Sequence, residues 1–267
     1  MPAALRRAQI LEQIERDGGV TVAELAREHA VSNMTAHRDL EQLARDGLVE
    51  RVRGGARALG GQPTSHPTAW AHRVGHAAAA KAAIAEVAAA IVAGGSTIFL
   101  DASSTALALA RRLTEDPPYE LALVTNSPAI VYEIHAESLH VVVCPGELDQ
   151  HTRAVSGRWT VDFLRELNFD IAFVSAAGLT PDAGLTTSRR PLADVLNAAR
   201  HGATRTIGLI DATKFGRASL VSIARGQDLD LIVTDGALDA ALADEYRRAG
   251  MALQLAAPGR AGSHVRT

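Results

Sequence analysis

The stretch Val31-Ser-Asn-Met-Thr-Ala-His-Arg-Asp-Leu40 decides how the amino-terminal part of this chain folds. Ser32 can cap a helix, because its hydroxyl can accept a hydrogen bond from an amide of the first helical turn. Met34 and Leu40 are expected to face a small core. Gly47 can adopt the left-handed conformation that often follows the last residues of a helix. The stretch therefore predicts a helix that begins after Ser32 and ends before Gly47.

Polar side chains crowd the first half of this helix. Short polar residues at a helix start, with a cation one turn further on, suit a helix that enters the major groove of DNA. We therefore interpret it as a recognition helix whose exposed end carries Asn33, Thr35, Ala36, His37 and Arg38.

The neighbouring segments complete a winged helix-turn-helix pattern. An amphipathic helix is predicted from Leu5 to Asp17, and Thr21 with Glu24 forms a capping box that opens a second helix. Residues 48–57 read as a glycine-turned hairpin with three arginines. The alternative is a three-helix bundle that binds nothing, but the order of the elements and the basic hairpin favour DNA binding. The predicted DNA-contacting residues are Ser32, Asn33, Thr35, His37, Arg38, Arg51, Arg53, Gly54 and Arg57.

The composition describes a soluble globular protein. Apolar residues make up 47% of the 267 residues, and no apolar run reaches the roughly 18 residues that span a bilayer. Residues 1–57 hold nine arginines and nine acidic residues, and the net charge of the chain is −3, so DNA contacts must come from a local basic patch. Cys144 is the only cysteine, and the chain does not start like a signal peptide. We expect a cytoplasmic protein without an internal disulfide.

A segment rich in glycine and proline separates two parts of the chain. We expect a DNA-binding domain at residues 1–57, a linker at 58–67, an α/β domain at 68–257 and a flexible tail at 258–267. In the third of these segments β-type runs alternate with helical patterns, which indicates a Rossmann-like α/β sheet with helices on both faces. The predicted strands include residues 97–100, 121–124, 139–143, 171–174, 206–210, 231–234 and 252–255.

Polar residues follow these predicted strands. Asp101-Ala-Ser-Ser-Thr105 opens a helix, where hydroxyls and free amides can hold an anion. Because ligands of such sheets bind at the carboxyl ends of the strands, the pattern predicts a small anionic ligand. Taken singly, Ser103 could be an ordinary cap and Lys214 an ordinary surface charge. The candidate effector-binding residues are Asp101, Ser103, Ser104, Thr105, Thr125, Asn126, Gly146, Gly178, Asp211 and Lys214.

Residues 5–57 resemble the amino-terminal domain of DeoR-type bacterial transcription repressors. The pattern of that family, V-S-x-x-T-I-R-R-D-L followed by L-x-R-x-x-G-G-A, reads here as Val31 to Leu40 and, with one additional residue after the leucine, as Leu48 to Ala56. Ala36 and His37 replace the isoleucine and the first arginine of the pattern. A histidine can still donate to a base edge or a phosphate, but it lacks the fixed charge and the fork of arginine. The alternative is that His37 faces solvent without a role.

The resemblance continues through the effector domain of that family, which is similar to sugar-phosphate isomerases. It implies a repressor of a sugar or polyol catabolic operon, controlled by a phosphorylated sugar or a related metabolite. Ser103 and Pro145 stand where the family has glycine, which changes two walls of the site. The landmarks D-x-G-T-T, T-N, G-G, S-G, G-x-T and D-x-S-K read here as Asp101-Ala-Ser-Ser-Thr105, Thr125-Asn126, Pro145-Gly146, Ser156-Gly157, Gly184-Leu-Thr186 and Asp211-Ala-Thr-Lys214.

The loop that would carry the acid of an isomerase contains no acid. The ribose-5-phosphate isomerases that the domain resembles have a D-G-A-D-E type loop, and the same place reads Ser175-Ala-Ala-Gly-Leu179 here. We therefore expect a sensor without catalytic residues or a cofactor. His72 and His76 lie one turn apart but lack a third ligand, so we expect no metal site. Two alternatives stay open: an isomerase-like enzyme fused to a helical module, and an interaction module without a small ligand.

The expected partners are operator DNA and the small metabolite, with no membrane. An operator usually presents two half-sites about one helical turn apart, and one chain supplies one recognition helix. We therefore expect a homo-oligomer, either a dimer or a tetramer.

Overall fold

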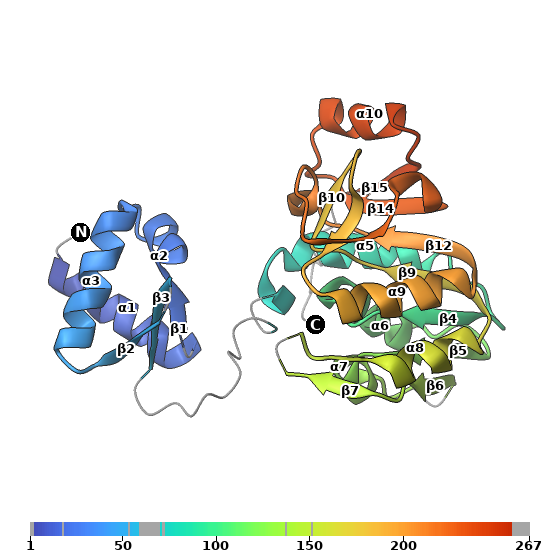
Figure 1. Cartoon of the computed structure of the whole chain (residues 1–267), viewed down its shortest axis with the longest axis horizontal. Coiled ribbons are helices and arrows are strands. Elements are labelled where there is room, and N and C mark those ends of the chain that lie inside the picture. Colours follow the sequence, from blue (N-terminus) through green and yellow to red (C-terminus); the bar gives the residue numbers. More distant parts are fainter. Residues whose placement is uncertain are drawn as a thin grey trace, which may run out of the picture. The chain divides into compact units, whose positions relative to one another are not determined.

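The computed structural model describes residues 3–17, 19–52, 54–58, 70, 73–136, 138–150 and 152–257. The chain divides into two compact units, Met1–Arg73 and Val74–Thr267 (Figure 1). Each has a hydrophobic core of its own. The expected linker lies outside the described residues except for Ala58, and the expected tail lies outside them entirely.

The first unit combines helices with a small antiparallel sheet whose strands pair in the order β1-β3-β2. The predicted winged helix-turn-helix is confirmed, and the short strand β1 is an addition that we did not predict. The elements in chain order are α1 (Ala3–Asp17), β1 (Gly19–Thr21), α2 (Val22–Glu28), α3 (Asn33–Arg45), β2 (Val49–Val52) and β3 (Gly55–Ala58).

Apolar side chains from each helix fill the core of this unit, among them Ile10, Leu25 and Leu40. Ala36 is fully buried with them, whereas Met34 exposes 64% of its surface. The expectations for these two residues were therefore wrong. Ala36 lies about one turn before Leu40 on the same face of α3. Met34 lies six residues before Leu40, which at about 100° per residue turns it about 120° away.

The second unit is built on a seven-stranded parallel sheet with the strand order β15-β14-β12-β9-β4-β5-β6. The helical and strand elements in chain order are α5 (Ala78–Ala89), β4 (Thr97–Leu100), α6 (Ser104–Glu115), β5 (Leu121–Thr125), α7 (Pro128–Glu133), β6 (Leu139–Val143), β7 (Glu147–Asp149), β8 (Ala154–Ser156), α8 (Arg158–Arg165), β9 (Phe169–Val174), β10 (Gly178–Thr180), β11 (Gly184–Thr187), α9 (Arg190–His201), β12 (Ala203–Leu209), β13 (Val221–Ala224), β14 (Leu231–Asp235), α10 (Ala240–Arg248) and β15 (Leu253–Ala256).

Helices cover both faces of this sheet, as a Rossmann-like fold requires. The helices α5 and α6 pack against each other on one face, and α8 and α9 pack against each other on the other (Figure 1). Successive strand residues alternate between the faces, so Phe99 joins the core under α8 and α9. The predicted α/β fold is confirmed.

The order of the strands places a switch point between β4 and β9. The chain runs outward from β4 through β5 to β6 and then returns to β9 on the other side of β4. Ligands of such sheets bind where the strand order reverses, at the carboxyl ends of the strands. The fold therefore directs attention to the residues that follow β4 and β9.

Two small antiparallel additions were not predicted: the hairpin of β7 and β8, and the sheet of β10, β11 and β13. Two single-turn helices, η1 (Ala212–Lys214) and η2 (Gly226–Asp228), flank β13. Over the described part of the chain, none of the helices has the length and apolar character needed to cross a bilayer.

Candidate functional site

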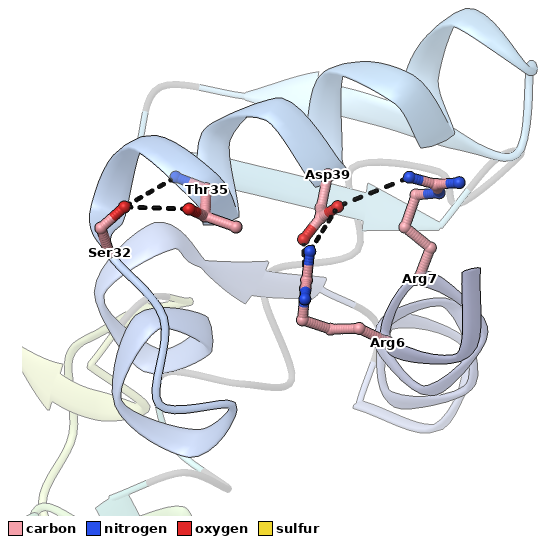
Figure 2. A network of polar contacts seen from close by, with 5 residues as sticks. All are labelled: Arg6, Arg7, Ser32, Thr35 and Asp39. Carbon is pink, nitrogen blue, oxygen red and sulfur yellow. Dashed lines mark hydrogen bonds and ion pairs between the residues drawn. The ribbon is translucent and has the colours of Figure 1, made fainter. Parts of the chain in front are cut away.

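The helix α3 begins at the predicted cap. The Oγ atom of Ser32 accepts a hydrogen bond from the amide of Thr35 at 3.2 Å, and the two hydroxyl oxygens lie 2.9 Å apart (Figure 2). Beyond the other end of α3, Gly47 has the left-handed φ of +67° that we expected of it. The two hydroxyls that we predicted to contact DNA are therefore hydrogen-bonded to each other at the start of α3.

Asp39 ties α3 to α1. Its carboxylate accepts a hydrogen bond from Arg6 Nε at 2.6 Å and lies 3.7 Å from Arg7 Nη1, and its exposed fraction is 4% (Figure 2). This hydrogen bond raises the pKa of the Arg6 guanidinium above its ordinary value. Arg38 is the next residue back on the helix and turns away from α1 into solvent. It makes no hydrogen bond or ion pair within the described residues.

The remaining DNA-binding candidates divide between the helix and the wing. Ser32 and Asn33 are exposed on α3, and Thr35 and His37 are half-buried there. Gly54, with φ of +87°, forms the wing turn. In the described part of the wing, Arg51 reaches α3 and is hydrogen-bonded to His37. Arg53 and the side chain of Arg57 lie outside the described residues, so their DNA contacts stay predictions.

In the second unit, Asp101 joins the two strands at the switch point. Its Oδ1 atom accepts a hydrogen bond from the amide of Ser103 at 3.1 Å, and its Oδ2 atom accepts one from the amide of Ser175, after β9, at 2.7 Å. The hydroxyl of Ser103 caps α6. The amides of Ser104 and Thr105 belong to the first turn of α6 and have no carbonyl partner inside the helix, which suits an anion.

Thr125 and Asn126, at the end of β5, are both fully buried and bonded to the backbone. Thr125 Oγ1 donates to the carbonyl of Leu100 at 2.8 Å, and Asn126 Nδ2 donates to the carbonyl of Val155 at 2.8 Å. The Oδ1 atom of Asn126 has no hydrogen-bond partner within the described residues. Buried acceptors are rarely left unpaired. This oxygen is enclosed, so a ligand hydroxyl can reach it only if the surrounding loops move.

Gly146 and Gly178 are explained by packing within the chain. Gly146 has φ of +145°, and a Cβ atom there would lie 2.1 Å from Thr160 Oγ1. A Cβ atom on Gly178 would lie 2.3 Å from the carbonyl oxygen of Arg217. Both positions need glycine even without a ligand, so the glycine pattern by itself does not locate the effector.

Lys214 lies in the loop after β12. Asp211, which is 2% exposed, accepts hydrogen bonds from the amide and the hydroxyl of Thr213 and so fixes the start of this loop. Further along, the hydroxyl of Tyr246 accepts a hydrogen bond from the amide of Gly216 at 2.9 Å, and burial raises the pKa of this tyrosine. Lys214 is half-buried, and its amine makes no ion pair within the described residues.

The structure brings several of the candidates to one edge of the sheet. Asp101, Asn126 and the loop of Lys214 follow β4, β5 and β12, and these strands lie side by side with β9 in the order β12-β9-β4-β5. Thr105 and Thr125 also lie there, but their side chains are buried. Gly146 follows the edge strand β6, and Gly178 belongs to the separate small sheet of β10.

A groove of about 860 Å³ runs between α8 and α9, and none of the ten candidate effector residues lines it. On the wall of this groove, charged side chains form ion pairs within one helix, as Arg158 and Asp162 of α8 do. The ligand site at the carboxyl edge stays a prediction, which the amides of the first turn of α6 and the unpaired oxygen of Asn126 at that edge favour.

Sequence reasoning missed one buried cation. Lys81 is 5% exposed, and its amine donates to the carbonyl of His76. It lies in the first turn of α5, a helix that packs against α6, β14 and β15. The signal was present in the sequence, since Lys81 falls on the same helical stripe as the buried residues Ile84 and Ala88.

The described residues contain no group of three histidine, cysteine or acidic side chains that could hold a metal ion. Of the two histidines considered as metal ligands, His72 lies outside the described residues. Cys144, after β6, is buried, and burial raises the pKa of its thiol to about 12.

Known proteins resemble this chain along most of its length. The family model of the DeoR-like helix-turn-helix domain matches residues 6–61, and that of the DeoR C-terminal sensor domain matches residues 76–236. The HTH-type transcriptional regulator GlpR of Haloferax volcanii is 32% identical over 254 residues, which cover 94% of this chain and 97% of the relative.

Two repressors are similar over comparable lengths. The glycerol-3-phosphate regulon repressor of Escherichia coli K12 is 28% identical over 88% of this chain and 92% of its own length. The lactose phosphotransferase system repressor of Lactococcus lactis is 29% identical over 90% of this chain and 94% of its own length. Among solved structures, ribose 5-phosphate isomerase A of Methanocaldococcus jannaschii aligns with a TM-score of 0.37 and 20% identity, over 51% of this chain and 53% of that chain.

Proposed function

Because the chain belongs to the DeoR family of transcriptional regulators, we propose that it represses an operon for the breakdown of a sugar or a polyol, and that a phosphorylated sugar-type metabolite controls its affinity for operator DNA. The family makes it a DNA-binding regulator rather than an enzyme. The names of two relatives, a glycerol-3-phosphate regulon repressor and a lactose phosphotransferase system repressor, support the choice of operon.

On the DNA side, the exposed first half of α3 enters the major groove. The observation that carries this proposal is the contrast between Asp39, held against α1 by Arg6, and Arg38, which faces solvent with no partner in the described residues. The anchor fixes the direction of the helix, and the free guanidinium can bind a base edge or a phosphate. Ser32, Asn33, Thr35 and His37 surround it on the first half of α3.

On the ligand side, the phosphate binds at the first turn of α6 with Lys214 as its counter-ion. The amides of Ser104 and Thr105 supply donors to an anion, and the positive end of the helix dipole adds to them. The unpaired oxygen of Asn126 is enclosed, and it accepts a hydrogen bond from a hydroxyl of the same ligand once the loops around it open. This combination of donors and an acceptor matches a phosphorylated sugar or polyol better than inorganic phosphate.

The protein acts in the cytoplasm as a homo-oligomer, a dimer or a tetramer. An operator with two half-sites needs two copies of α3 held about one helical turn apart. The second unit supplies the ligand site, and two copies of the chain supply the two recognition helices.

The ligand must distinguish two arrangements of the protein. It changes DNA affinity only if it binds one arrangement more tightly than the other. A coupling free energy of about 1–3 kcal/mol gives a response of about 5- to 150-fold.

A thermal-shift screen of phosphorylated sugars and polyols tests the ligand, and DNA-retention assays with each stabilising compound test the control of DNA binding. Lys214→Ala is expected to keep DNA binding and to blunt the response to the compound. Arg205→Ala is the control, because Arg205 is exposed near the amino end of β12, at the opposite edge of the sheet. If no compound raises the Tm, or if Lys214→Ala responds like the parent chain, the proposed ligand site is wrong.

A further inference from the structure

A hydrogen-bonded arginine joins the wing to the recognition helix. Arg51 lies on β2 two residues after Val49, so both side chains are on the face of the hairpin that packs against α3. Its Nη1 atom donates to the carbonyl of Gly55 at 2.7 Å, and its Nη2 atom lies 3.1 Å from Nδ1 of His37. The guanidinium is therefore held at two points, one on the hairpin and one on α3.

The chemistry of arginine decides the state of the histidine ring. A guanidinium has donors and no acceptor, so Nδ1 of His37 must be the acceptor of this hydrogen bond. The ring is then neutral, with its proton on Nε2. A protonated ring would turn an N–H group toward the guanidinium and would add a second positive charge beside it.

The proton on Nε2 is available for binding. His37 is half-buried. Its Nε2 atom makes no hydrogen bond within the described residues, and it is not one of the enclosed polar atoms that lack a partner there. It therefore opens to solvent. Asn33, one turn earlier, and Arg38 both flank it on the exposed half of α3.

We infer that Arg51 is a positioning residue for His37, and that it holds the ring as a neutral donor whose Nε2–H recognises a hydrogen-bond acceptor on a base edge of the operator. The inference rests on the proposed entry of α3 into the major groove. The acceptors exposed there are N7 and O6 of guanine, N7 of adenine and O4 of thymine. Arg51 thereby acts on sequence recognition through His37, in addition to any contact of its own.

The charged groups around His37 are compatible with a neutral ring. Arg51 faces it from β2, and Arg38 is its neighbour on α3. Glu41, one turn later on α3, is the carboxylate on that side of the helix, and it is exposed. Glu50 directly precedes Arg51 on β2, so its side chain lies on the opposite face of the hairpin.

The pH dependence of operator binding tests this inference. The probe is a duplex recovered from a random-sequence pool by selection on the purified full-length chain. The ring must be neutral in the complex, so affinity is present at high pH and is lost as the pH falls. We expect the affinity of the parent chain, divided by that of His37→Gln, to fall as the pH is lowered. For each bound copy, this affinity ratio can fall by at most about tenfold per pH unit.

Arg51→Met removes the group that holds the ring, so the loss of affinity on acidification is expected to disappear. Arg45→Met, at the far end of α3, removes the same charge and is expected to keep the profile of the parent chain. Melting curves show whether each variant is folded. The comparison of the parent chain with His37→Gln stands even if Arg51→Met does not fold.

Either of two results would contradict the inference. A parent profile that is flat, or that rises on acidification, overturns the neutral donor, because a histidine bound to phosphate as a cation gains affinity at low pH. An unchanged profile in folded Arg51→Met overturns the role of Arg51. The proposed placement of α3 is tested separately, because it fails only if Arg38→Ala also leaves operator affinity unchanged.

Discussion

Replacing Arg38 by alanine tests the recognition helix directly. The side chain is exposed and has no partner in the described part of the chain, so its loss is expected to change the free energy of unfolding by no more than about 0.5 kcal/mol. If Arg38 contacts a base, each copy loses about 1–3 kcal/mol of discrimination. A dimer then loses about 2–6 kcal/mol, which is about 30-fold to 20,000-fold in operator affinity.

A phosphate contact gives a different result in the same assay. Fluorescence anisotropy with an operator duplex and a random duplex, each over a range of salt concentrations, separates the two. A phosphate contact weakens binding to both duplexes and lowers the salt slope by about 0.9 for each contact. A base contact weakens binding to the operator selectively. Arg45→Ala is the control, because Arg45 is exposed at the carboxyl end of α3. Unchanged operator affinity in Arg38→Ala would refute the assignment of α3.

Three further predictions concern the second unit. Cys144, whose pKa is raised to about 12 by burial, should resist iodoacetamide at about pH 8 in the folded protein and react after unfolding in guanidinium; rapid alkylation of folded protein would contradict this. Tyr246→Phe removes a buried hydroxyl bonded on both sides and should cost about 1–3 kcal/mol in urea unfolding; an unchanged midpoint would contradict it. Gly178→Ala should lower the free energy of unfolding by about 1–3 kcal/mol, because the added Cβ atom would meet the carbonyl of Arg217. Gly75→Ala is the control and should not lower the Tm, because a Cβ atom there would meet open space.

The sequence predicted the recognition helix well where local chemistry decides the structure. The cap at Ser32, the capping box at Thr21 and the left-handed Gly47 depend on hydrogen bonds or dihedral angles of a few consecutive residues, and all three are present. The error lay in choosing the buried face. Met34 was assigned to the core because it is apolar, although the helical period favours Ala36.

Long-range contacts decide what the sequence did not predict in the second unit. The strands of the β7–β8 hairpin have three residues each, which is too short for a periodic pattern to be recognised. Backbone and side-chain hydrogen bonds between Val155 and Asn126 hold the hairpin. Sequence reasoning placed Asn126 at a strand end but could not show that its amide group binds the hairpin. In the same way, Thr125 was predicted to bind the ligand, yet its hydroxyl donates a hydrogen bond to the carbonyl of Leu100.

The two aspartates at the carboxyl edge favour a sensor over an isomerase. A base that moves a proton between carbons needs a carboxylate oxygen directed at the substrate. Asp101 instead accepts hydrogen bonds from the amides of Ser103 and Ser175, one through each oxygen. Asp211 accepts two from Thr213. These bonds hold the loops in which a ligand would lie. A ligand that binds those loops more tightly in one arrangement of the protein shifts the equilibrium toward that arrangement. The covalent bonds of the ligand stay unchanged, and control of DNA binding requires only this shift.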